Sequence, residues 1–182
     1  EYQIDSTAGT WNACTPNDGT FDGATEAFTC TVSAALSNGS HTMYVRATDS
    51  NSKTTPPGGA SSDTFSIDTT APSLSVTAPT TGSTVNGSQV VTFTNSEPTA
   101  PQCSVNNTDW VSCTSGSTTL SQLTSWSALP EGFAFTLYLR DTDTAGNIGT
   151  AQVANLTKAV TDTTPPVRSN PAPSGSLTAG TT

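Results

Sequence analysis

The side chains best suited to chemistry in this sequence are carboxylates and an amide in two short segments. Asp141, Asp143 and Asn147 lie close together, and Asp68 precedes a Thr-Thr-Ala-Pro segment far upstream. Calcium takes six to eight oxygen ligands, which include carboxylates, amides and backbone carbonyls. If the loop carrying the first three residues lies at the end of the fold where Asp68 enters, the four side chains meet there. We therefore predict calcium as a cofactor at this site.

A turn without a metal is the alternative for the same segments. Asp68 can accept backbone N–H groups within its own turn, while Pro72 fixes the conformation of the linker. The loop that begins at Asp141 is no EF-hand, because its fifth position is Ala145 and its twelfth is Gln152. Both interpretations remain open at this point.

Catalytic chemistry has little support. His41 is the only histidine, and it lies in a Gly-Ser-His-Thr segment at the start of a strand-like stretch. No G-x-S-x-G motif is present, and the four glutamates are dispersed at positions 1, 26, 97 and 131. We therefore predict that the protein is not an enzyme.

The four cysteines form two local groups, Cys14 with Cys30 and Cys103 with Cys113. A zinc site would require closer spacing and usually histidine, so two local disulfides are the better interpretation. Disulfides persist in oxidising compartments. We therefore predict an extracellular or cell-surface location.

The tryptophans suggest a second class of function. Trp11 and Trp110 each precede a cysteine by three residues, which favours packing against the fold or its disulfide. Trp126 lies in a Ser/Thr-rich segment before Pro130, and we predict an exposed aromatic there that could stack on a sugar. A carbohydrate-binding accessory module is therefore the alternative function. Four N-x-S/T sequons are possible glycosylation sites: Asn38, Asn86, Asn106 and Asn155.

Composition excludes two kinds of partner. Five Lys and Arg against fourteen Asp and Glu give a net charge of -9, which leaves no basic surface for nucleic acid. A membrane-spanning helix needs about 20 apolar residues in a row, and the apolar runs here are only a few residues long. We expect neither nucleic-acid binding nor a membrane span in this segment.

The elements that position these side chains follow from an internal repeat. Residues 44–49 (Tyr-Val-Arg-Ala-Thr-Asp) return as residues 138–143 (Tyr-Leu-Arg-Asp-Thr-Asp), and residues 68–72 return as residues 162–166 at the same offset of 94. This period is the size of one β-sandwich domain. The register predicts the later part of one domain over 1–68, a complete domain over 69–162, and the opening strand of a third over 163–182.

Alternating apolar residues predict short strands with one buried face. In the best example Phe133, Phe135, Leu137 and Leu139 recur at every second position. The fold class is therefore all-β, with antiparallel β-sandwiches in tandem; the motifs below resemble those of immunoglobulin-like sandwiches. The expected strands are 26–32, 40–48 and 63–68, then 73–78, 89–95, 101–106, 109–113, 118–124, 133–141 and 149–157.

Several motifs together resemble the bacterial immunoglobulin-like repeats of large surface and secreted proteins. They are the segments 2–5 (Tyr-Gln-Ile-Asp), 11–14 (Trp-Asn-Ala-Cys), 36–42 (Leu-Ser-Asn-Gly-Ser-His-Thr), 44–49, 67–72 and 143–147 (Asp-Thr-Ala-Gly-Asn). The resemblance implies tandem, rod-forming domains in adhesins, filaments or spacers, with calcium stiffening some linkers. Neighbouring repeats, identical filament subunits or cell-surface glycans would then be the partners.

Overall fold

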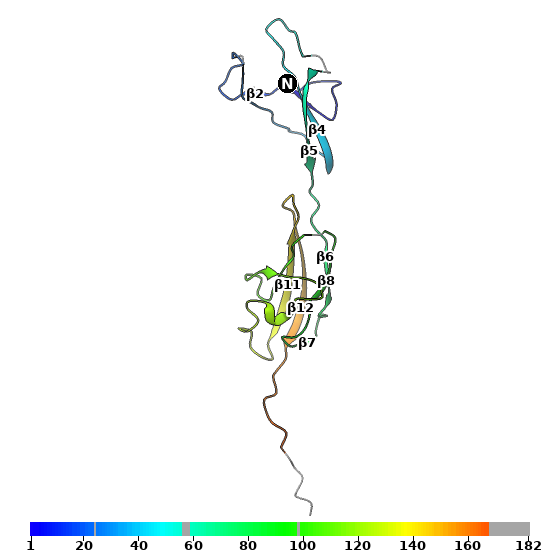
Figure 1. Ribbon diagram of the computed structural model, residues 1–182, viewed down its shortest axis with the longest axis vertical. Coiled ribbons are helices and arrows are strands. Elements are labelled where there is room, and N and C mark those ends of the chain that lie inside the picture. The colour runs from blue at the N-terminus through cyan, green and yellow to red at the C-terminus, as the bar shows by residue number, and fades with distance from the viewer. Residues whose placement is uncertain (24, 56–58, 98, 168–182) are drawn as a thin grey trace, which may run out of the picture.

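The computed structural model describes residues 1–23, 25–55, 59–97 and 99–167, and in these residues the chain is all-β, as predicted. Figure 1 shows two bodies in line, joined by an extended linker, residues 68–72, which spans the boundary between them. We call residues 1–68 the first region and residues 69–162 the second region. Within the described part of the chain, no helix is long and apolar enough to cross a membrane.

Three antiparallel strands form the main sheet of the first region, in the order β1-β4-β5. They are β1 (Tyr2–Ile4), β4 (Gly39–Val45) and β5 (Ser61–Ile67). Beside them β2 (Thr15–Pro16) pairs with β3 (Phe28–Thr29) to form a hairpin arm (Figure 1). The strand predicted over 26–32 is thus only two residues long, and β1 and β2 were not among the strands expected from the sequence.

The second region has a five-stranded sheet, in the order β10-β9-β11-β12-β7, and a two-stranded sheet, β6-β8. Strand β6 packs against β11 and β12, so the two sheets form a sandwich-like layer pair. The pairings are antiparallel, except that β7 joins the β12 edge in parallel. The strands are β6 (Leu74–Ala78), β7 (Thr84–Val85), β8 (Thr92–Asn95), β9 (Gln102–Ser104), β10 (Val111–Ser112), β11 (Ala134–Thr142) and β12 (Ile148–Lys158).

Alternation along β11 builds the core of the second region. Phe135, Leu137 and Leu139 are all buried there, as their period-two spacing predicted. Phe133 was expected to continue this face, but it precedes β11 and is 57% exposed, so that expectation is wrong. The other members of the buried cluster come from both sheets and the loops: Val85, Val91, Phe93, Cys103, Val105, Cys113, Leu120, Leu123, Trp126, Val153 and Leu156.

The strand predicted over 118–124 is also wrong. This segment contains a 3₁₀ helix, η2 (Leu120–Gln122), preceded by Thr119, whose backbone N–H donates to the Gln122 side chain at 2.7 Å. Leu120, Leu123 and Trp126 recur at every third position, which matches the period of a 3₁₀ turn. All three side chains are buried in the core. The strand prediction was wrong because it interpreted this three-residue spacing as strand-like alternation.

The first region buries much less apolar surface. Among its described residues Tyr2 is the only buried apolar side chain, and the other apolar side chains of its sheet are only half-buried. The third unit predicted over 163–182 lies mostly outside the described residues, and residues 163–167 contain no strand.

Candidate functional site

The linker between the two regions is held by side chains from both of them. From the first region, the Asn38 amide nitrogen donates to Thr70 Oγ1 at 2.7 Å. The Asn38 amide oxygen accepts the Thr69 N–H at 3.1 Å and the Thr69 hydroxyl at 2.8 Å. From the second region, the Asn147 amide nitrogen donates to the Asp68 carbonyl oxygen at 3.1 Å. Two asparagines thus restrain three consecutive linker residues.

Pro72 fixes the second-region end of the linker. Its side chain is buried, and its carbonyl oxygen lies against Gly149 at the start of β12. A Cβ atom at Gly149 would lie 1.9 Å from that oxygen, so no other residue fits at position 149 without displacing the linker. The linker is therefore packed onto the second region as well as hydrogen-bonded to it.

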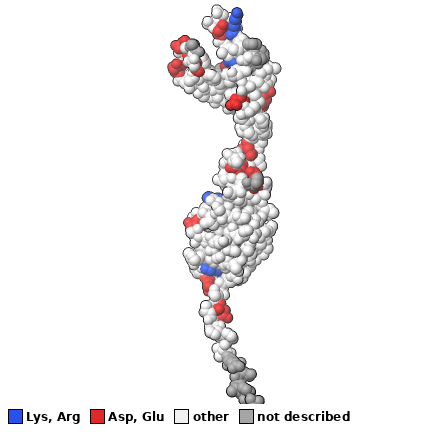
Figure 2. Space-filling view, in the orientation of Figure 1, with Lys and Arg blue, Asp and Glu red and all other residues white. Residues whose placement is uncertain are grey.

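Asp68 adopts the turn that was the alternative to metal binding. Its carboxylate Oδ1 accepts the Thr70 backbone N–H at 2.9 Å, as an Asx turn requires. Three of the four predicted calcium ligands meet at this junction, because Asn147 contacts both Asp68 and Asp143. Figure 2 shows carboxylates gathered where the two bodies meet.

Asp141 and Asp143 project from the end of β11 and are buried, with 2% and 7% of their surface exposed. Asp141 Oδ2 accepts the Asn95 amide at 2.6 Å and also the Thr99 hydroxyl. Asp143 accepts the Asn147 backbone N–H and side-chain amide, both at 2.8 Å. The hydrogen bond from the Asn147 side chain is the main reason why the pKa of Asp143 is lowered.

Glu97 also belongs to the group of carboxylates at the junction. It was not assigned there from the sequence, because it was counted among the dispersed glutamates. Burial raises the pKa of its carboxyl, and the negative charges of Asp143, Asp68 and Asp141 raise it further. The pairing of β6 with β8 brings it there, since the Ser96 N–H donates to the Ser73 carbonyl next to the linker. Antiparallel pairing of the predicted strands 73–78 and 89–95 was the signal that could have located it.

The closest group of three carboxylates in the described part of the chain lies away from the junction. Among the described residues, the one group of three carboxylates whose oxygens all lie within 4.8 Å of one another is Asp18, Asp22 and Glu26, in the loop of the arm. Glu26 there accepts the backbone N–H of Asp22 at 3.1 Å and that of Gly23. At the junction, hydrogen-bond donors already hold Asp141 and Asp143. Calcium bound by Asp68, Asp141, Asp143 and Asn147 stays a prediction.

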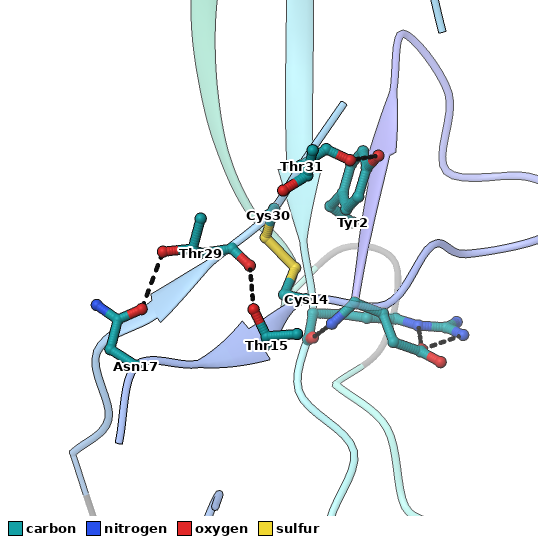
Figure 3. Close-up of a disulfide and its surroundings, with 9 residues drawn as sticks. Tyr2, Cys14, Thr15, Asn17, Thr29, Cys30 and Thr31 are labelled. Carbon is teal, nitrogen blue, oxygen red and sulfur yellow. Dashed lines mark hydrogen bonds and ion pairs between the residues drawn. A yellow bond between two sulfur atoms is a disulfide. The ribbon is translucent and has the colours of Figure 1, made fainter. Parts of the chain in front are cut away.

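Both predicted disulfides are present. Cys14 bonds Cys30 and Cys103 bonds Cys113, and no described cysteine is free. Figure 3 shows the first of them tying the base of the arm together beside Tyr2. The Tyr2 hydroxyl donates to the Thr31 carbonyl oxygen at 2.7 Å, which holds the returning strand of the arm against β1.

The same side-chain arrangement occurs once in each region. The Arg46 guanidinium lies over the Trp11 ring at 4.2 Å, and its Nε donates to Glu1 at 2.8 Å. The Arg140 guanidinium lies over the Trp110 ring at 4.3 Å, and its Nε donates to Gln102 at 2.8 Å. Trp11 and Trp110 therefore pack on the fold, as expected, and each ring is covered by an arginine guanidinium.

Trp126 does not provide the exposed aromatic that the sugar-binding alternative required. Only 7% of its surface is exposed, and its ring packs edge-to-face on Phe135 with 5.6 Å between ring centroids. The prediction of exposure is therefore wrong, because the turn that contains Leu123 rotates the indole into the core.

The four sequon asparagines are all exposed, but their side chains differ in freedom. Asn38 holds the linker, and the Asn106 amide nitrogen donates to both Asp109 and Ser125. Asn86 uses its amide oxygen for the Ser88 N–H, while Asn155 has φ of 59° at the bulge in β12. A glycan on Asn86 or Asn155 would disturb fewer hydrogen bonds than one on Asn38 or Asn106.

The chain matches no known family model and no curated protein.

Proposed function

We propose that this chain is an extracellular structural module, a segment of a rod-forming surface or filament protein built from immunoglobulin-like repeats. The observation that carries the proposal is the linker, which Asn38 holds from one side and Asn147 and Gly149 from the other. A junction built in this way limits bending between neighbouring bodies. Spacing and load bearing need such stiffness.

The repeated arginine arrangement supports the tandem interpretation. Arg46 and Arg140 are 94 residues apart, as the sequence repeat requires, and each covers the tryptophan that lies three residues before a cysteine. Two unrelated folds would not be expected to reproduce a tryptophan, an arginine and a side-chain acceptor in the same order. The two disulfides add support for an oxidising compartment.

The packing of the first region supports partners of its own kind. In the second region β6 and β8 cover the inner face of the larger sheet, and β7 extends its β12 edge. The described part of the first region contains no such second layer, and its sheet face is only half-buried. We propose that strands from a neighbouring repeat or an identical subunit cover this face.

The experiment is small-angle X-ray scattering of the full chain at fixed pH, with substitutions in the linker contacts. Asn38→Ala and Asn147→Ala together should broaden the pair-distance distribution and shorten the mean end-to-end distance, because the two bodies can then bend. Gln152→Ala, an exposed amide on β12, is the matched control and should leave the distribution unchanged. An identical distribution for the double variant and the wild type would remove the stiff-rod proposal.

The intact mass of the native polypeptide separates the two kinds of partner. A mass of hundreds of kilodaltons supports a long tandem array, whereas a mass near 18.5 kDa supports a small polymerising subunit.

A further inference from the structure

The single histidine lies between two oxygen acceptors. His41 is in β4 with 7% of its surface exposed. Its Nδ1 lies 2.6 Å from Asp5 Oδ2, and its Nε2 lies 2.7 Å from the Ser37 carbonyl oxygen. A neutral imidazole has one N–H donor and one lone pair, so it could donate to only one of these oxygens and would direct a lone pair at the other. An imidazolium donates to both.

We propose that His41 acts as a protonated latch, which ties the end of β1 to the turn before β4 and releases one of them when the pH rises. The latch would affect the linker, because Ser37 precedes Asn38, whose side chain hydrogen-bonds to Thr69 and Thr70. The first region would therefore grip the linker more firmly in mildly acidic than in alkaline surroundings. That consequence for rod stiffness rests on the proposed function, whereas the protonation of His41 does not.

Asp5 is fixed in place for this contact. Its other carboxylate oxygen accepts the Thr42 N–H at 2.8 Å, and its own N–H donates to the Thr42 carbonyl at 2.8 Å. Its φ of 60° lies in the left-handed region, which aspartate tolerates better than most residues. The carboxylate therefore stays beside the ring without depending on His41 alone.

Few other charges act on the ring. From β5 the Phe65 ring packs on it with 5.8 Å between ring centroids. Asp63, also on β5, pairs with Met43 rather than with His41, and it is exposed. The segment 31–38 carries no titratable side chain, and among the described residues Asp5 is the one charged group bonded to the ring.

The direction of the pH effect follows from these contacts. The hydrogen bond to the Ser37 carbonyl and then that to Asp5 raise the pKa of His41 above 6.5. The stabilisation is therefore complete below the unfolded pKa of about 6.5 and is lost as the pH rises through the folded value. The hydrogen bond from His41 and then that from Thr42 lower the pKa of Asp5, so its contribution is lost only at acidic pH.

Nuclear magnetic resonance of the full chain tests the latch without ambiguity, since only one imidazole is present. The ¹⁵N shifts of the ring should show both nitrogens protonated at pH 6.5, with a titration midpoint above that of a histidine in an unfolded peptide. Asp5→Asn keeps the shape of the contact but removes its charge, and it should move the midpoint downward. A wild-type midpoint at or below the peptide value would overturn the proposal.

The coupling to the linker is tested on the same samples by amide exchange at Thr69, corrected for the intrinsic effect of pH. Protection of this amide should fall as the pH passes the His41 midpoint in the wild type. It should be independent of pH in this range in His41→Gln, and Gln152→Ala should behave like the wild type. Equal pH dependence in wild type and His41→Gln would overturn the latch. Failure of the scattering experiment at fixed pH, by contrast, would affect only the rod proposal.

Discussion

The two regions share a local pattern and differ in what that pattern is packed against. Val45 of β4 pairs with Tyr2, while Leu139 of β11 pairs with Cys103, so Tyr2 and Cys103 occupy matching positions. Cys113 therefore bonds within its own sheet, across the β9–β10 pair. Its counterpart Cys14 bonds the far strand of the arm. Cys14 and Cys113 therefore occupy the same position in the repeat but form different disulfides, because the residue at the matching position in the sheet is Tyr2 in the first region and Cys103 in the second.

The segment after that cysteine shows what the second sheet contributes. In the second region it runs along residues 89–93, where the Val91 N–H donates to the Thr118 carbonyl at 2.8 Å and the Leu120 N–H to the Gln89 carbonyl at 3.0 Å. In the first region the corresponding segment pairs with itself as the arm, and Phe21 and Phe28 are 59% and 43% exposed. This segment therefore packs into the core only in the second region, where residues 89–93 are present to hydrogen-bond with it.

The largest expected difference between the regions comes from truncating matched core positions. Leu139→Ala should destabilise the second region by about 2–5 kcal/mol, because the side chain is completely buried in a closed core. Val45→Ala, at the matching position, should cost well under half of that, since Val45 is only half-buried. Hydrogen exchange measured by mass spectrometry along a denaturant series assigns each loss to its region.

Equal losses at the two positions would show that the first region has a core as well packed as that of the second. The contrast drawn from burial would then be wrong, and the first region would not need a partner to cover its sheet. Thr150→Ala, on the exposed face of β12, is the control and should change neither region appreciably.

Loss of the Cys14–Cys30 disulfide is the next largest effect. Closing a loop of this length contributes about 3 kcal/mol in the chain-entropy model, and the sequence separation is 16. Cys14→Ser with Cys30→Ser should therefore unfold the arm and the sheet edge beside Tyr2, while the second region keeps its stability. Limited proteolysis should cut first between the two former cysteines. Unchanged resistance there would mean that the arm is held by its own packing.

The sequence predicted what is local and missed what depends on pairing between segments that are distant in the chain. Cysteine spacing and the strand from Ala134 to Thr142 follow from patterns within a few residues, and both are observed. The helical turn at Leu120 depends on its hydrogen bond to Gln89, and the burial of Trp126 depends on its packing against Phe135, contacts that no local pattern predicts. Of the junction, Asp141, Asp143 and Asn147 lie close together in the sequence, and Asp68 was placed beside them from the expected arrangement of the fold. Glu97 was missed because only strand pairing brings it near.

The smallest expected effect on stability is that of replacing Glu97, and it should be limited to the second region, where Glu97 lies. Burial and three neighbouring carboxylates raise the pKa of Glu97, so its protonated form is favoured on folding. The second region should therefore lose stability as the pH rises from the unfolded pKa through the folded one, and Glu97→Gln should melt higher than the wild type at pH 7 when a chelator is present.

If the junction binds calcium, adding the ion should reverse the order of the melting temperatures of the wild type and Glu97→Gln. The ion would offset the repulsion among the carboxylates and would use the charge of Glu97, so millimolar calcium should raise the melting temperature of the wild type more than that of Glu97→Gln. The sheet of the first region is the control: hydrogen exchange at Thr42 and Val45, which lie outside the arm that carries Asp18, Asp22 and Glu26, should not change with calcium. A wild type whose melting temperature is the same in calcium and in chelator would remove calcium from the junction. The hydrogen bonds of Asn95, Thr99 and Asn147 would then be what keeps Asp141 and Asp143 buried beside Glu97.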